Sequence, residues 1–320
     1  MRSHLLFRDT ESIQKVLPIY FQKWWLDLAY GEGNWTYVTV NNSDGFIIGL
    51  LPLSIKKKWG IKIITMAKDT HYGGPFIIFE KQRKPDSQLS YAHDIIERLL
   101  DQIPNVSFIY FQLYTSFSSV LPFYWKNYKL SFSYTYQLNL HTSFEDLMDN
   151  MKGSTRTEIK KCIQNGVKIK INLDKEVFLK FVQAQQSKMT YEYDVAFYKK
   201  LLNSLQRGKL FDLICAVNEN EEILAGIIVV YDGETVFYKV GINKKNRNDN
   251  GALTFCLWET ICHFKKQGLK TFDFEGSDIK TIEHFFRSFG GDLTPVYRVF
   301  WSKNIFVRIL SYIQNSKLFG

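Results

Sequence analysis

Leu121-Pro122-Phe123-Tyr124-Trp125-Lys126-Asn127-Tyr128 faces Ile282-Glu283-His284-Phe285-Phe286-Arg287-Ser288-Phe289 when the two halves of the chain are aligned without a gap. The same offset of 161 residues places Phe111 opposite Phe272, Ser116 opposite Ser277 and Tyr136 opposite Tyr297. Identities are few, but apolar, basic and small positions coincide across a helix–strand boundary, as they do in repeats that share a buried core. The pattern predicts a tandem duplication of one α/β unit.

Hydrophobic periodicity gives both halves the same order of elements. In the first half we expect a helix over 11–29, three strands over 35–40, 46–55 and 61–66 that form a meander, a helix over 88–102, a strand over 107–113, a short helix over 119–127 and a strand within 130–140. In the second half we expect a helix over 143–165, a strand over 167–172, a long helix over 175–206, a meander of strands over 210–218, 222–231 and 235–242, a helix over 251–266, a strand over 270–274, a helix over 281–289 and a strand over 294–301. The predicted class is α/β with a mixed sheet, in two domains: residues 1–140, and residues 141–320 with a C-terminal helix near 305–313.

Composition narrows the functional classes. The 320 residues are 45% hydrophobic and 23% charged with only 7 prolines, which indicates a folded globular chain. The sequence contains neither the apolar core of a signal peptide nor a run that would span a membrane, so we expect a soluble, cytoplasmic protein. The net charge of +9 suits phosphate-rich ligands, although a solvated basic face is the commoner cause of such a surplus.

The sequence around the four cysteines predicts buried structural thiols and not metal ligands or nucleophiles. Cys162, Cys215, Cys256 and Cys262 form no C-x-x-C pair, and no histidine stands at a zinc-ligand spacing from them. We therefore expect no metal. A thiol nucleophile would also need a partnered histidine, and none can be placed beside them from the sequence.

An α/β unit with a three-strand meander followed by helix, strand, helix and strand resembles the GNAT acyltransferase fold. Two such units in tandem resemble the Fem peptidyltransferases and the related acetyltransferase domain found beside biotin- and cellulose-synthesis genes. The local stretches that carry the resemblance are Ser154-Thr155-Arg156-Thr157-Glu158-Ile159-Lys160-Lys161, Asn250-Gly251-Ala252-Leu253, Phe272-Asp273-Phe274-Glu275-Gly276-Ser277 and Ile282–Gly290. The resemblance covers residues 140–301 well and residues 1–140 more loosely, and it implies a transferase that needs no covalent enzyme intermediate.

The resemblance also implies a donor site. In GNAT enzymes the pyrophosphate of acyl-CoA lies on a helix N-terminus at the pattern Q/R-x-x-G-x-G/A, where backbone N–H groups and the helix dipole bind anions. The matching residues are Arg247, Asn250, Gly251 and Ala252, with Asn250 in place of the first glycine and Asp249 adding a negative charge. An ordinary helix start with small residues is the alternative interpretation. Acyl-CoA is the predicted co-substrate, while the Fem branch implies aminoacyl-tRNA instead.

Two carboxylates stand at the end of the strand that follows the donor helix. Alternation places Asp273 and Glu275 on one face, with Phe272 and Phe274 on the other. In open α/β sheets such strand ends face the ligand cleft, so Glu275 is predicted to accept the proton of an acceptor amine and Asp273 to hold the acceptor. The alternative is a structural role, in which Glu275 is only solvated and Ser277 caps the next helix. The facing positions of the first half, 86–91, Gln112 and Tyr114, have no glycine and no carboxylate pair, so only the second half is expected to bind the donor.

The remaining candidates have weaker support. His71 and Tyr72 begin a glycine-rich loop, and Arg156 shares nearly one helix face with Lys160 and Lys161. These residues and Ser277 are predicted to contact substrate. The alternative for His71 is a plain loop residue, which is the commoner case, and a solvated basic face is equally compatible with Arg156. Tyr238 precedes the anion loop and is a candidate acid for the leaving group, or a core residue.

The sequence thus predicts an N-acyltransferase that moves an acyl group from acyl-CoA to an amine acceptor bound between the halves. The acceptor would be a small molecule or a peptide or sugar amine, and a backbone N–H of the last meander strand would polarise the donor carbonyl. Two alternatives remain: a Fem-like transferase that uses aminoacyl-tRNA on a cell-wall precursor, and a tandem GNAT fold that only binds a ligand. DNA and membrane spans are not expected as partners or features.

Overall fold

Residues 7–58, 60–67, 69–79, 84–117, 119–186, 194–204, 210–244, 251–276 and 279–303 are described by a computed structural model of the chain. Their contacts divide the chain into a first unit, Met1–Ser133 with Pro295–Gly320, and a second unit, Tyr134–Thr294. The division falls inside two strands, whereas the sequence places the domain boundary at residue 140. The predicted C-terminal helix near 305–313 lies outside the described residues.

The first unit contains strands in two sets. Strands β1 (Thr36–Asn41), β2 (Ile47–Leu53) and β5 (Phe76–Ile77) form a three-stranded sheet, while β3 (Ile55–Lys58), β4 (Ile61–Ile64), β6 (Phe108–Gln112) and β13 (Asp292–Ser302) follow one another in the order β3-β4-β6-β13. Helices α2 (Pro85–Asp101) and α3 (Leu121–Trp125) complete the unit. The predicted single meander is therefore wrong here, because the predicted strand over 46–55 breaks at Ser54 and its two parts join different sheets.

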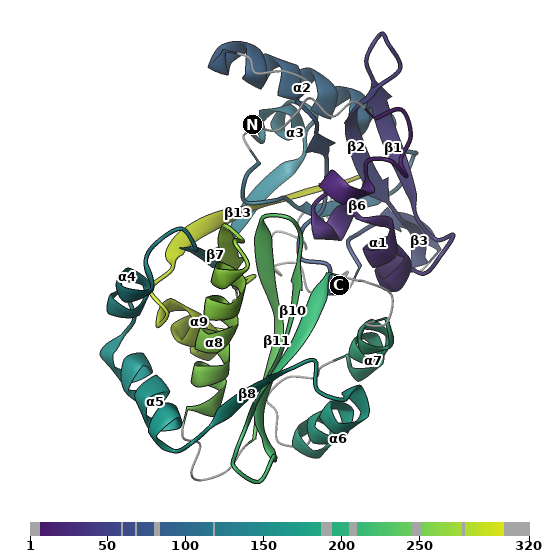
Figure 1. The fold of residues 1–320 in the computed structure, drawn as a ribbon. Helices are drawn as coiled ribbons and strands as arrows, with labels where there is room; N and C mark the ends of the chain where they lie inside the picture. The colour runs from purple at the N-terminus through teal and green to yellow at the C-terminus, as the bar shows by residue number, and fades with distance from the viewer. Residues whose placement is uncertain are drawn as a thin grey trace. The chain divides into compact units, whose positions relative to one another are not determined.

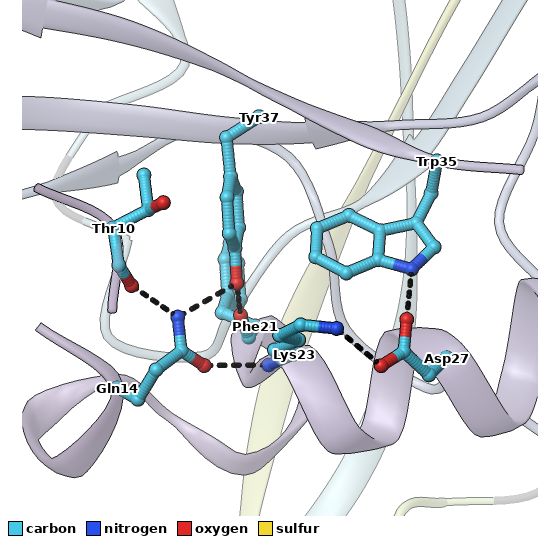
Figure 2. Close-up of polar contacts among 7 residues, drawn as sticks. All are labelled: Thr10, Gln14, Phe21, Lys23, Asp27, Trp35 and Tyr37. Atoms are coloured by element: carbon cyan, nitrogen blue, oxygen red, sulfur yellow. Dashed lines mark hydrogen bonds and ion pairs between the residues drawn. The ribbon is translucent and has the colours of Figure 1, made fainter. Parts of the chain in front are cut away.

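The N-terminal segment of the first unit is not the continuous helix that periodicity predicts. Two 3-10 turns over Gln14–Val16 and Ile19–Phe21 precede α1 (Lys23–Tyr30), because Pro18 between the turns has no N–H for a helical ladder. The Gln14 side chain links the pieces: its Oε1 accepts a hydrogen bond from the Lys23 N–H at 2.6 Å, and its Nε2 donates to the Thr10 carbonyl at 2.6 Å (Figure 2). Asp27 then joins α1 to the sheet by accepting from Trp35 Nε1 at 2.8 Å.

The second unit carries the predicted meander. Strands β9 (Phe211–Val217), β10 (Ile223–Tyr231) and β11 (Thr235–Asn243) pair antiparallel, and β12 (Thr271–Asp273) joins β11 in parallel. With β7 (Lys129–Asn139) and β8 (Lys168–Ile171) the order is β7-β12-β11-β10-β9-β8. Its described helices are α4 (Phe144–Asp149), α5 (Gly153–Gln164), α6 (Lys175–Gln186), α7 (Val195–Asn203), α8 (Ala252–Lys266) and α9 (Lys280–Arg287).

Helices cover both faces of this meander. Ala225 and Ile227 of β10 belong to a buried core with α8, whereas Gly226, which points to the other face, packs against Phe178 of α6. Figure 1 shows α8 on one side of β10 and β11, with α6 and α7 on the other. The predicted helix over 143–165 divides into α4 and α5, with the predicted Ser143 cap confirmed by its hydrogen bond from the Asp146 N–H at 3.0 Å. The described part of the predicted long helix consists of two helices, α6 and α7, and residues 187–193 between them lie outside the described residues.

The last strand of each half pairs with the other half of the sequence. β7 ends the first half, yet its residues Gln137–Asn139 pair with β12, and β13 ends the second half, yet its residues Arg298–Ser302 pair with β6. The two registers are the same under the sequence offset: Phe272 faces Leu138, and Phe111 faces Val299. The structure thus repeats one strand register in both halves, as the duplication inferred from sequence implies. The last strand of each half, β7 or β13, pairs with a strand of the other half.

Candidate functional site

The candidate site lies where β11 and β12 part. The two strands pair only from Thr235 to Phe237 against Thr271 to Asp273, after which β11 continues to Asn243 and β12 ends. Just beyond this point, the Lys239 Nζ lies 2.8 Å from the Glu275 Oε2, and the two side chains are 3% and 8% exposed. A buried ion pair therefore bridges the two strands where their backbone pairing stops.

Lys239 occupies a β-bulge. On the β10 side of β11, Ile228 faces Val240 and Val229 faces Tyr238, so the register skips Lys239. Bulges add local twist and turn a side chain out of the regular alternation, and they are common beside active sites. Lys239 thus lies at an irregular position of β11, and its ammonium contacts a carboxylate in the turn that follows β12.

Asp273 is enclosed by hydrogen-bond donors. Its Oδ1 accepts from Thr135 Oγ1 at 2.6 Å and from the Glu275 N–H at 2.8 Å, and its Oδ2 accepts from Gln137 Nε2 at 2.9 Å. The residue is 0% exposed. A buried carboxylate with three donors is a satisfied charge, so Asp273 is held in one place by β7 and by its own turn.

Glu275 has an unusual backbone conformation. Its φ is 59° and that of Gly276 is 69°, in the left-handed region that residues with a Cβ seldom adopt. Gly276 is required there, because a Cβ on it would lie 2.0 Å from the Tyr134 carbonyl oxygen. Such outliers persist only where the surroundings determine them and they gather at functional sites.

Burial raises the pKa of the Glu275 carboxyl well above its ordinary value, because the charged form loses its water. The Lys239 ammonium acts in the opposite direction by favouring the carboxylate at 2.8 Å. The two groups together form a buried acid–base pair at a strand end. A carboxylate with a raised pKa is suited to taking a proton from an amine near neutral pH.

The start of α8 holds a carboxylate that the sequence interpretation missed. Gly251 is the N-cap with φ 76°, and Ala252 is the first helical residue. The Glu158 Oε2 accepts from Thr254 Oγ1 at 2.6 Å in the first turn, and a Cβ on Gly251 would lie 2.5 Å from the Glu158 Cβ. A negative side chain from α5 therefore stands at the predicted anion site, whose residues Arg247 and Asn250 lie outside the described part of the chain.

The other predicted residues are placed in separate settings. Tyr238 is buried in the second unit with its ring 5.3 Å from that of Phe286. Arg156 donates from one guanidinium nitrogen to the carbonyls of Met148, Asp149 and Met151 at 2.7–3.4 Å, closing the end of α4. Ser277 lies outside the described residues.

His71 and Tyr72 belong to the first unit. Tyr72 is fully buried with its ring 4.7 Å from that of Tyr114, and the His71 carbonyl accepts from Gln112 Nε2 at 3.0 Å. Their predicted contacts with substrate stay predictions. The structure brings Asp273 and Glu275 together through a hydrogen bond from the Glu275 N–H to Asp273 and not through strand alternation, because β12 ends at Asp273 and Glu275 has a positive φ. It adds Lys239, whose sequence signal is a charged residue inside an otherwise apolar strand.

The cysteines are buried in the second unit and unpaired by disulfides. Burial raises the pKa of the Cys215 and Cys262 thiols to about 12, which leaves little thiolate to act as a nucleophile. Within the described ranges, no group of three or more His, Cys, Asp and Glu side chains is arranged to hold a metal ion. No described helix has the length and apolar character needed to cross a membrane.

Comparison with known proteins agrees with this architecture. Residues 152–287, which lie within the second unit, match the family model of the acetyltransferase (GNAT) domain. None of the curated protein sequences compared with the chain matches it.

Solved structures of similar fold include FemX, with a TM-score of 0.63 and 11% identity over 90% of this chain and 93% of that one. L-PGS from Bacillus licheniformis has a TM-score of 0.53 and 13% identity over 90% and 89%. The C-terminal domain of a putative lysylphosphatidylglycerol synthetase from Agrobacterium fabrum has a TM-score of 0.56 and 10% identity over 96% and 94%. These likenesses confirm the predicted Fem-like fold of two GNAT-like units.

Proposed function

We propose that the chain is an N-acyltransferase whose chemistry takes place where β11 and β12 part. The observation that carries the proposal is the buried Lys239–Glu275 pair at this point, 2.8 Å between Nζ and Oε2, within a segment that matches the GNAT domain model. An acid–base pair held at a strand end supplies what amine acylation needs beyond alignment of the substrates.

The proposed reaction is direct. The acceptor nitrogen attacks the donor carbonyl carbon, a C–N bond forms, and the nitrogen's proton passes to Glu275. The tetrahedral oxyanion collapses and the bond to the thiolate or alkoxide leaving group breaks, with Tyr238 as the proposed proton donor to that group. Lys239 keeps Glu275 ionised before attack, because its ammonium offsets the effect of burial on the carboxylate.

The chemical identities of the donor and the acceptor are also proposals. Acyl-CoA is the donor that GNAT domains imply, with its pyrophosphate at residues 247–252. One observation favours the second candidate, aminoacyl-tRNA: the Glu158 carboxylate already stands in the first turn of α8, where it repels a second anion. The acceptor is proposed to be an amine of a small molecule, peptide or sugar precursor, and its predicted location between the halves stays a prediction.

The donor is tested by thermal unfolding of the full chain with acetyl-CoA, longer acyl-CoAs or aminoacyl-tRNA. A ligand at 100 times its Kd stabilises the fold by about 2.7 kcal/mol, so the true donor is expected to raise Tm clearly. Glu158→Gln keeps an acceptor for Thr254 but removes the charge, and Glu176→Gln on α6 serves as the matched control. A CoA response that appears or strengthens only in Glu158→Gln favours the tRNA donor. Failure of every donor to raise Tm would favour the interpretation as a fold that only binds another ligand.

The pH dependence follows from the direction of the Glu275 shift. A base must be deprotonated to act, and burial raises its pKa, so kcat/KM is expected to fall with decreasing pH along a limb that lies above the ordinary range of glutamate. Lys239→Met removes the ammonium that favours the carboxylate, and it is expected to move that limb to still higher pH. The measurement is kcat/KM across pH for both proteins, and a limb at the ordinary glutamate range in the native chain would contradict the assignment.

A further inference from the structure

We propose that Asp273 is a positioning residue that sets the left-handed backbone at Glu275 and thereby aims the Glu275 carboxyl at Lys239. The inference rests on the proposed function and replaces the sequence-based expectation that Asp273 holds the acceptor. It concerns residues of the second unit alone.

The Asp273 carboxylate already has its hydrogen-bond partners within the protein. Its two oxygens accept from Thr135 Oγ1, the Glu275 N–H and Gln137 Nε2 at 2.6, 2.8 and 2.9 Å, and the residue is fully buried. An acceptor amine would have to displace one of these donors and reach a group without solvent access. Direct substrate contact is therefore the less favourable role.

The turn after β12 links Asp273 to the backbone of Glu275. An aspartate side chain that accepts from the N–H two residues ahead stabilises a turn at the intervening residues. Here that N–H belongs to Glu275, whose φ is 59°. Since the direction of a side chain follows from its backbone, the same hydrogen bond that holds the turn also fixes where the Glu275 carboxyl points, and it points to Lys239 Nζ.

The repeat provides a second copy of this position in the first unit. The offset of 161 residues places Gln112 opposite Asp273 and Arg298 opposite Gln137, and these pairs face each other across strands in both units. The cross-strand hydrogen bond is also present in both, from Arg298 Nε to Gln112 Oε1 at 2.9 Å in the first unit. Gln112 reaches back to the His71 carbonyl instead of ahead, and Tyr114, which corresponds to Glu275, has no positive φ.

The comparison separates two roles of this position. Pairing across the strands does not require a carboxylate, because the first unit achieves it with an amide and a guanidinium. The carboxylate of Asp273 is found only in the unit where Glu275 has a left-handed backbone and pairs with Lys239. The structure thus associates Asp273 with the aim of Glu275 and not merely with closure of the sheet.

The test combines structure and kinetics. Asp273→Ala removes the oxygen that accepts from the Glu275 N–H, which an asparagine would retain, and we expect a crystal structure to show Glu275 outside the left-handed region or displaced from Lys239. Thr135→Val, which removes one donor to Asp273, is expected to give a smaller change and is the variant to use if Asp273→Ala does not fold. Unchanged geometry at Glu275 in a folded Asp273→Ala protein overturns the proposal, whatever the activity.

The kinetic arm is a double-mutant cycle. Asp273→Ala is expected to lower kcat by ~10–100-fold with little change in acceptor KM, and to add nothing when combined with Glu275→Gln, because both act through one group. A raised KM at constant kcat, or losses that multiply, overturns the proposal. Asp212→Ala is the matched control, since Asp212 on β9 is buried and accepts from Asn172 Nδ2 at 2.9 Å; its kcat should stay at the native value. Native activity in Glu275→Gln itself would instead reject the proposed function, with the structural arm still deciding the role of Asp273.

Discussion

Glu275→Gln is expected to lower kcat by ~10²–10⁴-fold, the range for loss of a general base. Glutamine retains the size and the hydrogen-bonding capacity of glutamate but accepts no proton from the amine. The same change removes the carboxylate partner of a lysine whose side chain is 3% exposed. Breaking a buried pair on one side costs about 3–5 kcal/mol, so loss of folded protein must be separated from loss of chemistry.

The double variant Lys239→Met with Glu275→Gln makes that separation. It removes both charges and fills the space with an apolar chain, a change that is often neutral for stability. We expect chemical denaturation to show a stability near that of the native chain, while kcat stays at the level of the single variant. Recovery of activity together with stability in the double variant would show that the pair is structural.

A fragment of residues 141–320 is expected not to fold cooperatively. It lacks β7, so the edge of β12 is open and Asp273 loses its contacts with Thr135 and Gln137. The buried core also loses Tyr136, Leu138 and Leu140. Each such side chain contributes roughly 1.5–3 kcal/mol when fully buried, and unsatisfied buried groups cost about 1–3 kcal/mol each. Together these losses rival the 5–15 kcal/mol that stabilises a typical domain.

The matched fragment is residues 129–294, which keeps all of β7 and omits most of β13. Thermal unfolding followed by circular dichroism is expected to be cooperative for residues 129–294 and broad or absent for residues 141–320. Both fragments contain the meander, α8 and α9, and they differ in β7 at one end and in the residues from 295 onward at the other. Cooperative unfolding of residues 141–320 at the temperature of the full chain would mean that the pairing of β7 with β12 is dispensable.

The repeat could be predicted from sequence because a duplicated core preserves the pattern of buried side chains. Phe111 and Phe272 occupy the same register against the strands that pair with β6 and β12, as the alignment implies. Which strand closes which sheet is not encoded in local periodicity, because β7 and β13 have the same pattern whichever half they join. The contacts divide the chain within β7 and β13, while the expected domain boundary at residue 140 stays a prediction.

Part of the candidate site could be predicted from the sequence. Alternation predicts that Asp273 and Glu275 lie at one strand end, but the direction of the Glu275 side chain depends on a left-handed turn, and Lys239 lies at a bulge. Neither the turn nor the bulge follows from the strand propensity of these residues. Likewise, the Glu158 carboxylate reaches α8 from a helix 96 residues earlier in sequence, and only the packing of α5 on α8 reveals it.

The exchange of closing strands also has a consequence for how the chain matures. Arg298 of β13 bonds to Gln112 of β6 across 186 residues, so the first unit's sheet stays open at β6 until nearly all the described chain has been made. At about 5–20 residues per second this is a wait of roughly 10–40 s. During that time an apolar strand with an open edge can pair with other chains. A lower growth temperature or a bound chaperone is therefore expected to raise the yield of native protein more than a substitution of Lys239 or Glu275 does.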